Sequence, residues 1–249
     1  MTLPLLSLLL ACAKEPSSAA AAPPPDRHPA PASRDIGSPP GAPSCPMISW
    51  VPHVNTARDA ILKNDLPVIR AELRWMAASP SLPKNLTPPV TPSSATTTSA
   101  AESDEPRAAA LFLGELGVTC GGCHQGHGPS IAEPTPPTPD AGVLPHMHRH
   151  LWAIDRMWEG LMGPAELNWN QGVALLAGMD LDPSTFVGRD EQDTPAGYLA
   201  PWIRRIGVES LRTGDVQMRG RLYGDLLATC AECHAGTLGA PDPQHATPR

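Results

Sequence analysis

An all-α protein is predicted by three features of this sequence of 249 residues. Outside its Pro-rich stretches the chain is dominated by Ala, Leu, Met and Trp, whereas Phe and Tyr occur only twice each. Runs of β-branched residues, which strands favour, are almost absent. Apolar residues instead recur at the three- and four-residue spacing of a helix face. The 32 prolines gather in a few stretches, so the folded parts are smaller than the chain length suggests.

The first twelve residues have the pattern of an export signal. A short apolar run ends in Leu9-Leu10-Ala11-Cys12, and it is too short to span a bilayer. This ending resembles a bacterial lipobox, in which the signal peptide is cut before a cysteine that is then acylated. No basic residue precedes the run, so an ordinary secretory signal is the alternative. Both interpretations place the protein in the periplasm, and the lipobox adds a signal peptide over 1–11 and a lipid anchor on Cys12.

Residues 12–47 have the composition of a linker. They are rich in Pro, Ala and Ser and show no apolar periodicity. Such a segment cannot bury enough surface to fold, and it is typical of a semi-extended tether. A tether of this kind would hold a lipid-anchored domain away from its membrane.

Two helices are predicted at the start of the folded part, over residues 52–64 and 66–78. Both have apolar residues at helical spacing, and Pro67 is tolerated because it falls in the first turn of its helix. Residues 79–106 are rich in Pro, Ser and Thr, and they are expected to form a loop with at most one weak helix. A further helix is predicted over 106–124.

The second part of the chain repeats this order of elements. Residues 144–179 predict two helices that are interrupted at Gly163-Pro164. Two more helices are predicted over 195–212 and 214–234.

The two parts are expected to be an internal repeat. Aligning His53 with His150 also aligns Ile61 with Trp158. In both parts a His-bearing helix, a second helix and a connection lead to a helix that ends in Cys-x-x-Cys-His, so two tandem four-helix-bundle-like domains are predicted. In order, the expected domains are a first bundle over 48–127, a Pro-rich linker over 128–142, a second bundle over 143–238 and a disordered tail over 239–249.

Two matching motifs carry the expected chemistry. They read Cys120-Gly-Gly-Cys123-His124 and Cys230-Ala-Glu-Cys233-His234. Their spacing is that of c-type haem attachment. Two thiols three residues apart on one helical turn can form thioethers with the two vinyl groups of a porphyrin, and the next residue offers its imidazole to the iron. The chain is therefore expected to carry two covalently attached haem c groups, with His124 and His234 as proximal iron ligands.

Three other uses of these cysteines explain the pattern less well. Structural zinc sites usually pair cysteines about 15–20 residues apart. Cys120 and Cys230 lie 110 positions apart, and zinc needs no histidine after each pair. A thioredoxin-like pair needs a βαβ context, which is not predicted here. Plain disulfides in an exported protein would leave both histidines unexplained.

A helical bundle with Cys-x-x-Cys-His near the end of its last helix resembles the class II cytochromes c, the cytochrome c-prime and c-556 type. The resemblance covers most of residues 50–125 and 143–236. It implies one haem in each bundle and a first helix that supplies the group on the other side of the iron. In low-spin members that group is a ligand, often Met, and in high-spin members the position is open. A tandem two-haem chain departs from the usual single bundle, and the first part here lacks a regular third helix.

Histidines on the first helix of each part are the candidate distal iron ligands. His53 and His150 are the first choice, because they occupy matching places in the expected repeat. His150 lies on an apolar stripe, where the alternative is a histidine that is simply a satisfied core residue. His146, one turn earlier on the same face, and Met147, with its soft thioether, are the rival ligands.

The choice of ligand separates the candidate functions. Two axial ligands suit iron to electron transfer, whereas an open position admits small gases or peroxide. The expected function is one-electron transfer, not catalysis, with periplasmic or membrane redox proteins as partners. The alternatives are a haem-based gas-binding or sensing protein, a di-haem peroxidase, for which the sequence offers no cluster of acid, base and Arg, and a zinc-binding structural lipoprotein. A net charge of −7 without a Lys/Arg block disfavours nucleic acid as a partner.

Overall fold

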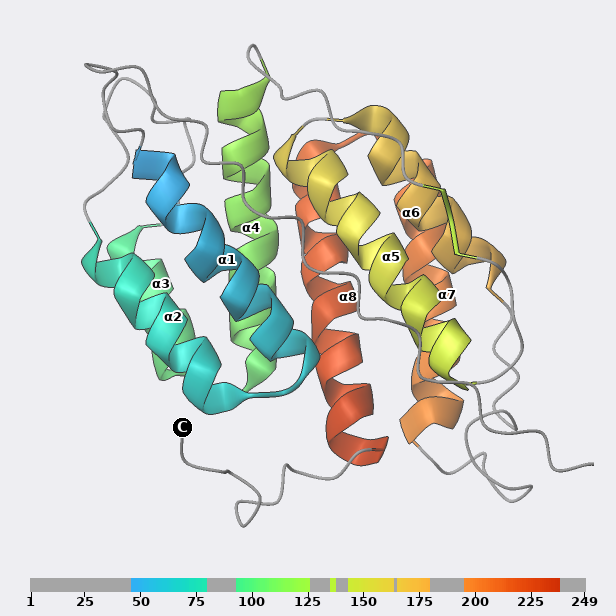
Figure 1. The fold of residues 1–249 in the computed structure, drawn as a ribbon, viewed down its shortest axis with the longest axis horizontal. Coiled ribbons are helices and arrows are strands. Elements are labelled where there is room, and N and C mark those ends of the chain that lie inside the picture. Colours follow the sequence, from blue (N-terminus) through green and yellow to red (C-terminus); the bar gives the residue numbers. More distant parts are fainter. Residues whose placement is uncertain are drawn as a thin grey trace, which may run out of the picture. The chain divides into compact units, whose positions relative to one another are not determined.

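The computed structural model describes residues 46–79, 93–125, 135–137, 143–163, 165–179 and 195–237. These residues contain helices and no strand, so the prediction of an all-α protein is confirmed for this part of the chain. The described helices belong to one compact unit, Ser44–Arg249. In chain order (Figure 1) they are α1 (Pro46–Leu62), α2 (Leu66–Ala78), α3 (Ser94–Glu102), α4 (Pro106–His124), α5 (Val143–Met162), α6 (Glu166–Gly178), α7 (Pro195–Arg212) and α8 (Val216–Thr237). The expected signal peptide, the lipidated Cys12 and the C-terminal tail lie outside the described residues.

Most helices begin and end close to the positions that the sequence predicts. α2, α4 and α7 have the predicted bounds, and the break between α5 and α6 falls at Gly163. α2 begins where it does because the Asp65 carboxylate accepts a hydrogen bond from the Val68 amide at 3.3 Å, while Pro67 fills a first-turn position that needs no N–H. Just after α1, Asn64 takes a left-handed conformation, with φ of 55°, which turns the chain towards α2.

The largest departure from the predicted helices is α3, which forms in the Ser/Thr-rich segment that was expected to be mostly loop. Ser93 caps it, because its hydroxyl accepts a hydrogen bond from the Thr96 amide at 3.0 Å. Its buried residues are all small: Thr97, Ala100 and Ala101. Packing of this small face against α2 and α4 therefore supplies the stability that the weak helix propensity of Thr and Ser does not.

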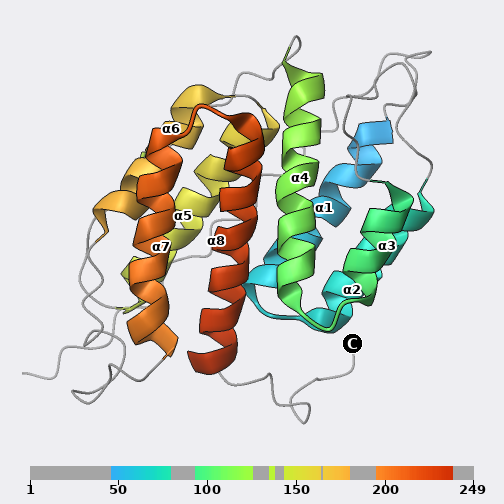
Figure 2. The same cartoon turned by 180° about the vertical axis from the view of Figure 1, so that it is seen from behind.

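The helices pack as two sets that meet mainly through α4 and α8, while α4 also contacts α5 and α1 also contacts α8. α1 to α4 contact one another, as do α5 to α8, and α4 lies beside α8 in both views (Figures 1 and 2). The two central helices are antiparallel, because Arg107 near the start of α4 pairs with Asp225, while Val118 further along lies against Gly220. Their C-terminal ends therefore point in opposite directions.

Glycines make the close contact between α4 and α8 possible. A Cβ atom on Gly114 would lie 2.1 Å from the Gly220 carbonyl oxygen, and one on Gly224 would lie 2.8 Å from the Leu111 Cα. Any side chain at these positions would collide with the backbone of the other helix. The contact between the two sets thus depends on residues without a side chain.

Gly114→Ala is expected to lower the free energy of unfolding by about 2–3 kcal/mol, because the added methyl group must push two helix backbones apart. Gly178→Ala is the matched control, since Gly178 is also helical but nothing lies within 4 Å of a Cβ atom built there. Urea denaturation of both variants measures the difference. Equal effects would show that α4 and α8 do not meet through Gly114.

The two sets are related by a shift of 100 positions in their first two helices. α1 and α5 end at Leu62 and Met162, and α2 and α6 are both 13 residues long. The buried residues also coincide, with Ile69, Leu73 and Met76 in α2 and Trp169, Val173 and Leu176 in α6. His150 therefore corresponds to Trp50, so the predicted pairing of His53 with His150 is wrong by three positions. The two parts share too few identical residues for the sequence alone to determine how they align. The positions of their buried residues determine the alignment.

Candidate functional site

The two Cys-x-x-Cys-His motifs are helical and lie near the C-terminal ends of α4 and α8. Because these helices are antiparallel, the motifs lie at opposite ends of the pair (Figure 2). Gly114 of α4 lies beside Gly224 of α8, and each motif histidine follows its glycine by ten positions. The two helices run in opposite directions from this contact with a rise of 1.5 Å per residue, so the two motifs lie about 30 Å apart. The two cysteine pairs cannot share one tetrahedral zinc ion over that distance, and the described residues, the two motifs included, contain no group of three or more His, Cys, Asp or Glu side chains placed to hold a metal ion.

Each motif histidine is oriented by the first helix of the other set. His124 Nδ1 donates a hydrogen bond to the Met162 carbonyl oxygen at 2.8 Å, at the end of α5. His234 Nδ1 donates in the same way to the Leu62 carbonyl oxygen, at the end of α1. The last carbonyls of a helix have no partner within it, so they are available as acceptors. A neutral imidazole that donates from Nδ1 keeps its Nε2 lone pair, so both histidines are prepared to bind a metal through Nε2.

The cysteines of the two motifs share one pattern of exposure. Cys120 and Cys230 are buried, and burial raises the pKa of each thiol to about 12. Cys123 and Cys233, one turn later, are only half-buried. Each motif thus presents one protected thiol and one thiol near the surface on a single helical turn. The spacing of the two thiols on one helical turn, together with the oriented histidine, is the feature that is compatible with the covalent attachment of a haem.

Two buried histidines of α5 lie near the second motif. The Nε2 atoms of His146 and His150 are 2.9 Å apart on successive turns. Burial, helped by the nearby His146, His234 and Arg149, lowers the pKa of His150 to about 3, and burial also lowers the pKa of His146. Both rings are therefore neutral at pH 7, the form that binds a metal. The charge of His234 is one of the causes of the shift at His150, so His150 lies on the side of α5 within electrostatic reach of the second motif.

The other candidate ligands are placed differently. His53 Nδ1 pairs with the Glu72 carboxylate at 2.6 Å, and the His53 ring stacks on Trp75 with the ring centroids 3.5 Å apart. Both of these neighbours belong to α2. His53 is thus held against α2 and not brought to a motif. Met147 lies between His146 and the exposed His148 and is half-buried.

A cavity of about 410 Å³ adjoins the first motif at His124. Its walls come from both sets of helices: Val51, Asn55 and Arg58 of α1 and Asp155, Trp158, Glu159 and Met162 of α5. His53 lies about 160° around α1 from Val51 and Asn55, since successive helical residues are 100° apart. The first motif therefore has a hollow beside it, and His53 does not face that hollow.

Charged residues meet at this cavity although the sequence shows no cluster of acid, base and Arg. Arg58 lies 3.0 Å from the Asp155 carboxylate, and the Asp155 side chain is 37% exposed. Glu159 borders the same space and accepts a hydrogen bond from the Asn168 amide at 2.8 Å. These residues come from helices nearly a hundred positions apart, and only packing brings them together.

Arg58→Met is expected to lower the free energy of unfolding by about 1–3 kcal/mol, since it leaves Asp155 beside the buried Tyr223 without its countercharge. The double variant Arg58→Met/Asp155→Asn should recover part of this loss in a double-mutant cycle. Arg205→Met, in the exposed pair with Glu209, is the control and should change stability by less than about 0.5 kcal/mol. A double variant no more stable than Arg58→Met would show that the pair does not couple the two sets.

Sequence reasoning missed the groups that hold the motifs in place. The carbonyls of Leu62 and Met162 have no sequence signature, because every residue carries one. The contact between α5 and α4 does have a signature in small residues. A Cβ atom on Gly121 would lie 2.1 Å from the Leu161 carbonyl oxygen, and Gly117 packs against the Leu161 side chain.

No protein-family model, curated protein or solved structure matches this chain. Among the helices of the described ranges, none is both long enough and apolar enough to cross a membrane.

Proposed function

We propose that this protein is a di-haem c-type cytochrome that transfers single electrons in the periplasm. The observation that carries the proposal is the matched pair of motif histidines, each donating from Nδ1 to a helix-end carbonyl with Nε2 left for iron. A bound haem supplies an iron that alternates between the ferric and ferrous states. The residues that would hold the two groups are Cys120, Cys123 and His124 for the first and Cys230, Cys233 and His234 for the second.

The proposal includes the organisation that the sequence predicts. Each haem would belong to its own four-helix-bundle-like part, as the resemblance to class II cytochromes implies. The Pro/Ala-rich residues 12–47 would tether these parts to a membrane through a lipid on Cys12. The partners would be periplasmic or membrane redox proteins, and the protein would act as a carrier and not as an enzyme.

His150 is the favoured distal ligand of the second haem. It is buried and neutral, and it lies within electrostatic reach of His234. His146 and Met147 remain the rivals on the same helix. His53 is a weaker candidate for the first haem, because its ring is occupied by contacts with α2. Two axial ligands on the second iron suit that site to electron transfer.

A gas-binding or sensing role at the first motif is the second candidate function. Trp50 stands where the second set has His150, and the cavity of about 410 Å³ adjoins His124. A first haem without a histidine on its other side would leave one coordination position open to a small ligand. The two haems would then differ in function.

Absorption spectra of the protein, expressed with the haem-maturation machinery, test both candidates. Two low-spin c-type haems, in the air-oxidised and the dithionite-reduced states, are expected for a pure electron carrier. A high-spin component that shifts with carbon monoxide would assign gas binding to one haem. The absence of any Soret band despite working maturation would refute the haem proposal, and metal analysis would then test for zinc.

A further inference from the structure

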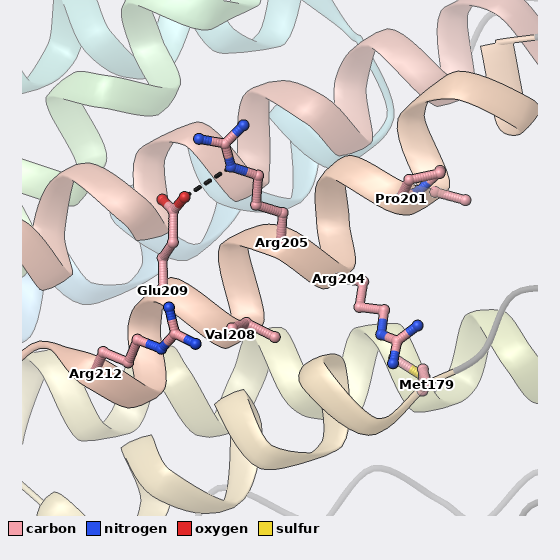
Figure 3. A pocket seen from close by; sticks show the side chains of 8 residues that line it. Met179, Pro201, Arg204, Arg205, Val208, Glu209 and Arg212 are labelled. Carbon is pink, nitrogen blue, oxygen red and sulfur yellow. Dashed lines mark hydrogen bonds and ion pairs between the residues drawn. The ribbon is translucent and has the colours of Figure 1, made fainter.

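A groove of about 600 Å³ follows α7 (Figure 3), and none of its described lining residues belongs to either motif. Its apolar lining comes from Met179, just after α6, and from Ala200, Pro201 and Val208 of α7. Its charged lining comes from Arg204, Arg205, Glu209 and Arg212. The groove thus combines an apolar surface with charged side chains that approach it from one helix.

The groove is positively charged in a chain that is acidic as a whole. The chain has a net charge of −7, whereas the described lining residues of the groove include three arginines and one glutamate, which together carry a net charge of +2. Arg205 Nε donates to the Glu209 carboxylate at 2.7 Å, and Arg204 Nε donates to the Ala177 carbonyl oxygen at 3.3 Å. Figure 3 shows Arg205 turned towards Glu209 and Arg204 reaching towards Met179. These contacts position the guanidinium groups, so less side-chain freedom is lost when a ligand binds.

Exposed aromatic side chains extend this surface along α7. Tyr198 and Trp202 are 53% and 45% exposed, and the Arg205 guanidinium lies 4.8 Å from the centroid of the Trp202 ring. The three residues are spaced four and three apart, so they share one face of the helix. Trp, Tyr and Arg are the residue types that dominate the binding energy of protein interfaces. An exposed stripe of these residues beside a groove is therefore typical of a docking surface.

The aromatic end of α7 lies at the same end of the structure as the second motif. α7 and α8 pack together (Figure 2) and are joined by only three residues, 213–215. Tyr198 in α7 and Cys230 in α8 lie the same number of residues from the middle of this connection. Because the two helices pack side by side, these residues lie at the same level. A protein bound at this end would approach the second Cys-x-x-Cys-His motif.

We propose that the α7 surface, meaning the groove with Tyr198 and Trp202, docks a protein partner that presents carboxylates beside apolar side chains. The carboxylates would pair with Arg204 and Arg212, and an apolar side chain would enter beside Val208. The concave shape favours a protein segment over a flat lipid surface. Docking does not depend on haem. Only its purpose, bringing a redox partner to the second motif, rests on the proposed function.

The test uses full-length protein and a fluorescein-labelled peptide rich in Glu and Leu, with the corresponding Gln and Leu peptide as a negative probe. Fluorescence anisotropy should show binding of the acidic peptide that weakens with salt. Arg204→Gln/Arg212→Gln and, separately, Trp202→Ser should weaken it about tenfold or more. Arg70→Gln/Arg107→Gln, which removes two arginines from the α1–α4 set, is the matched control and should bind as the unchanged protein does. Circular dichroism melts confirm that the variants are folded.

Several results would overturn the proposal. These are no binding of the acidic peptide, equal weakening in the α7 and control variants, or binding by the Gln peptide as well. Binding to phosphatidylglycerol vesicles that requires Arg204 and Arg212, without peptide binding, would identify the surface as a membrane contact instead. The haem proposal is tested separately, because a Soret band without peptide binding refutes only the docking surface. Peptide binding without a Soret band refutes only the cytochrome.

Discussion

Replacing both cysteines of one motif is expected to remove one covalently bound haem and to leave the other in place. Cys120→Ala/Cys123→Ala and Cys230→Ala/Cys233→Ala should each have the mass of a chain with one haem, because the two motifs lie about 30 Å apart at opposite ends of the α4–α8 pair. Intact-protein mass spectrometry under denaturing conditions counts the attached groups. Absorption spectra of the two variants then assign a separate spectrum to each site.

The control for this experiment is Cys45→Ala, which changes a cysteine outside both motifs and should keep two haems. Loss of both groups from either double variant would contradict two independent attachment sites. If the protein and all variants have the mass of the polypeptide without haem, and the purified protein contains stoichiometric zinc, the motifs bind metal and not haem. Because each motif histidine contacts the end of a helix in the other set, the one-haem variants should also be less stable.

His150→Leu is expected to convert the second haem from six-coordinate and low-spin to five-coordinate and high-spin. The substitution removes the buried neutral imidazole near His234 and replaces it with a side chain that cannot bind iron. About half of the low-spin absorption should be lost if both haems start low-spin, and the variant should bind carbon monoxide at the second site. Measuring these spectra in the Cys120→Ala/Cys123→Ala background isolates the second haem.

His53→Leu is the matched control, since it removes a half-buried histidine from α1 whose Nδ1 is paired with Glu72. It should leave both haem spectra unchanged and cost only the stability of the contacts with α2. A spectral change in His53→Leu would contradict the placement of this side chain. An unchanged second haem in His150→Leu, with a change in His146→Leu or Met147→Leu, would move the ligand to one of the rival residues.

Much of the fold follows from local patterns in the sequence. Pro67, Gly163 and the Asp65 cap mark helix boundaries that depend on the backbone of a few adjacent residues, and these boundaries were predicted correctly. Local sequence patterns do not predict α3, because Thr and Ser have weak helix propensity. The helix depends instead on the packing of Ala100 and Ala101 against neighbouring helices.

The alignment of the two parts also could not be determined from local sequence patterns. Aligning His53 with His150 is reasonable when only residue identities are compared. The correct shift becomes visible only when helix ends and buried faces are compared, and it places Trp50 opposite His150. The suggestion that the two haem sites differ therefore depends on the structure and not on the motifs, which are the same in both parts.

The sequence by itself determined that the chain is helical and that it carries two Cys-x-x-Cys-His motifs, because both properties depend on residues within a few positions of one another. Only the tertiary structure decided that the motifs lie at opposite ends of an antiparallel pair and that each histidine is oriented by the other set. It also decided that Arg58 meets Asp155 beside the first motif. These arrangements depend on glycine contacts such as that between Gly114 and Gly220, where two helix backbones approach too closely for any side chain. Such contacts join residues about a hundred positions apart, and no local pattern in the sequence records which pairs will meet.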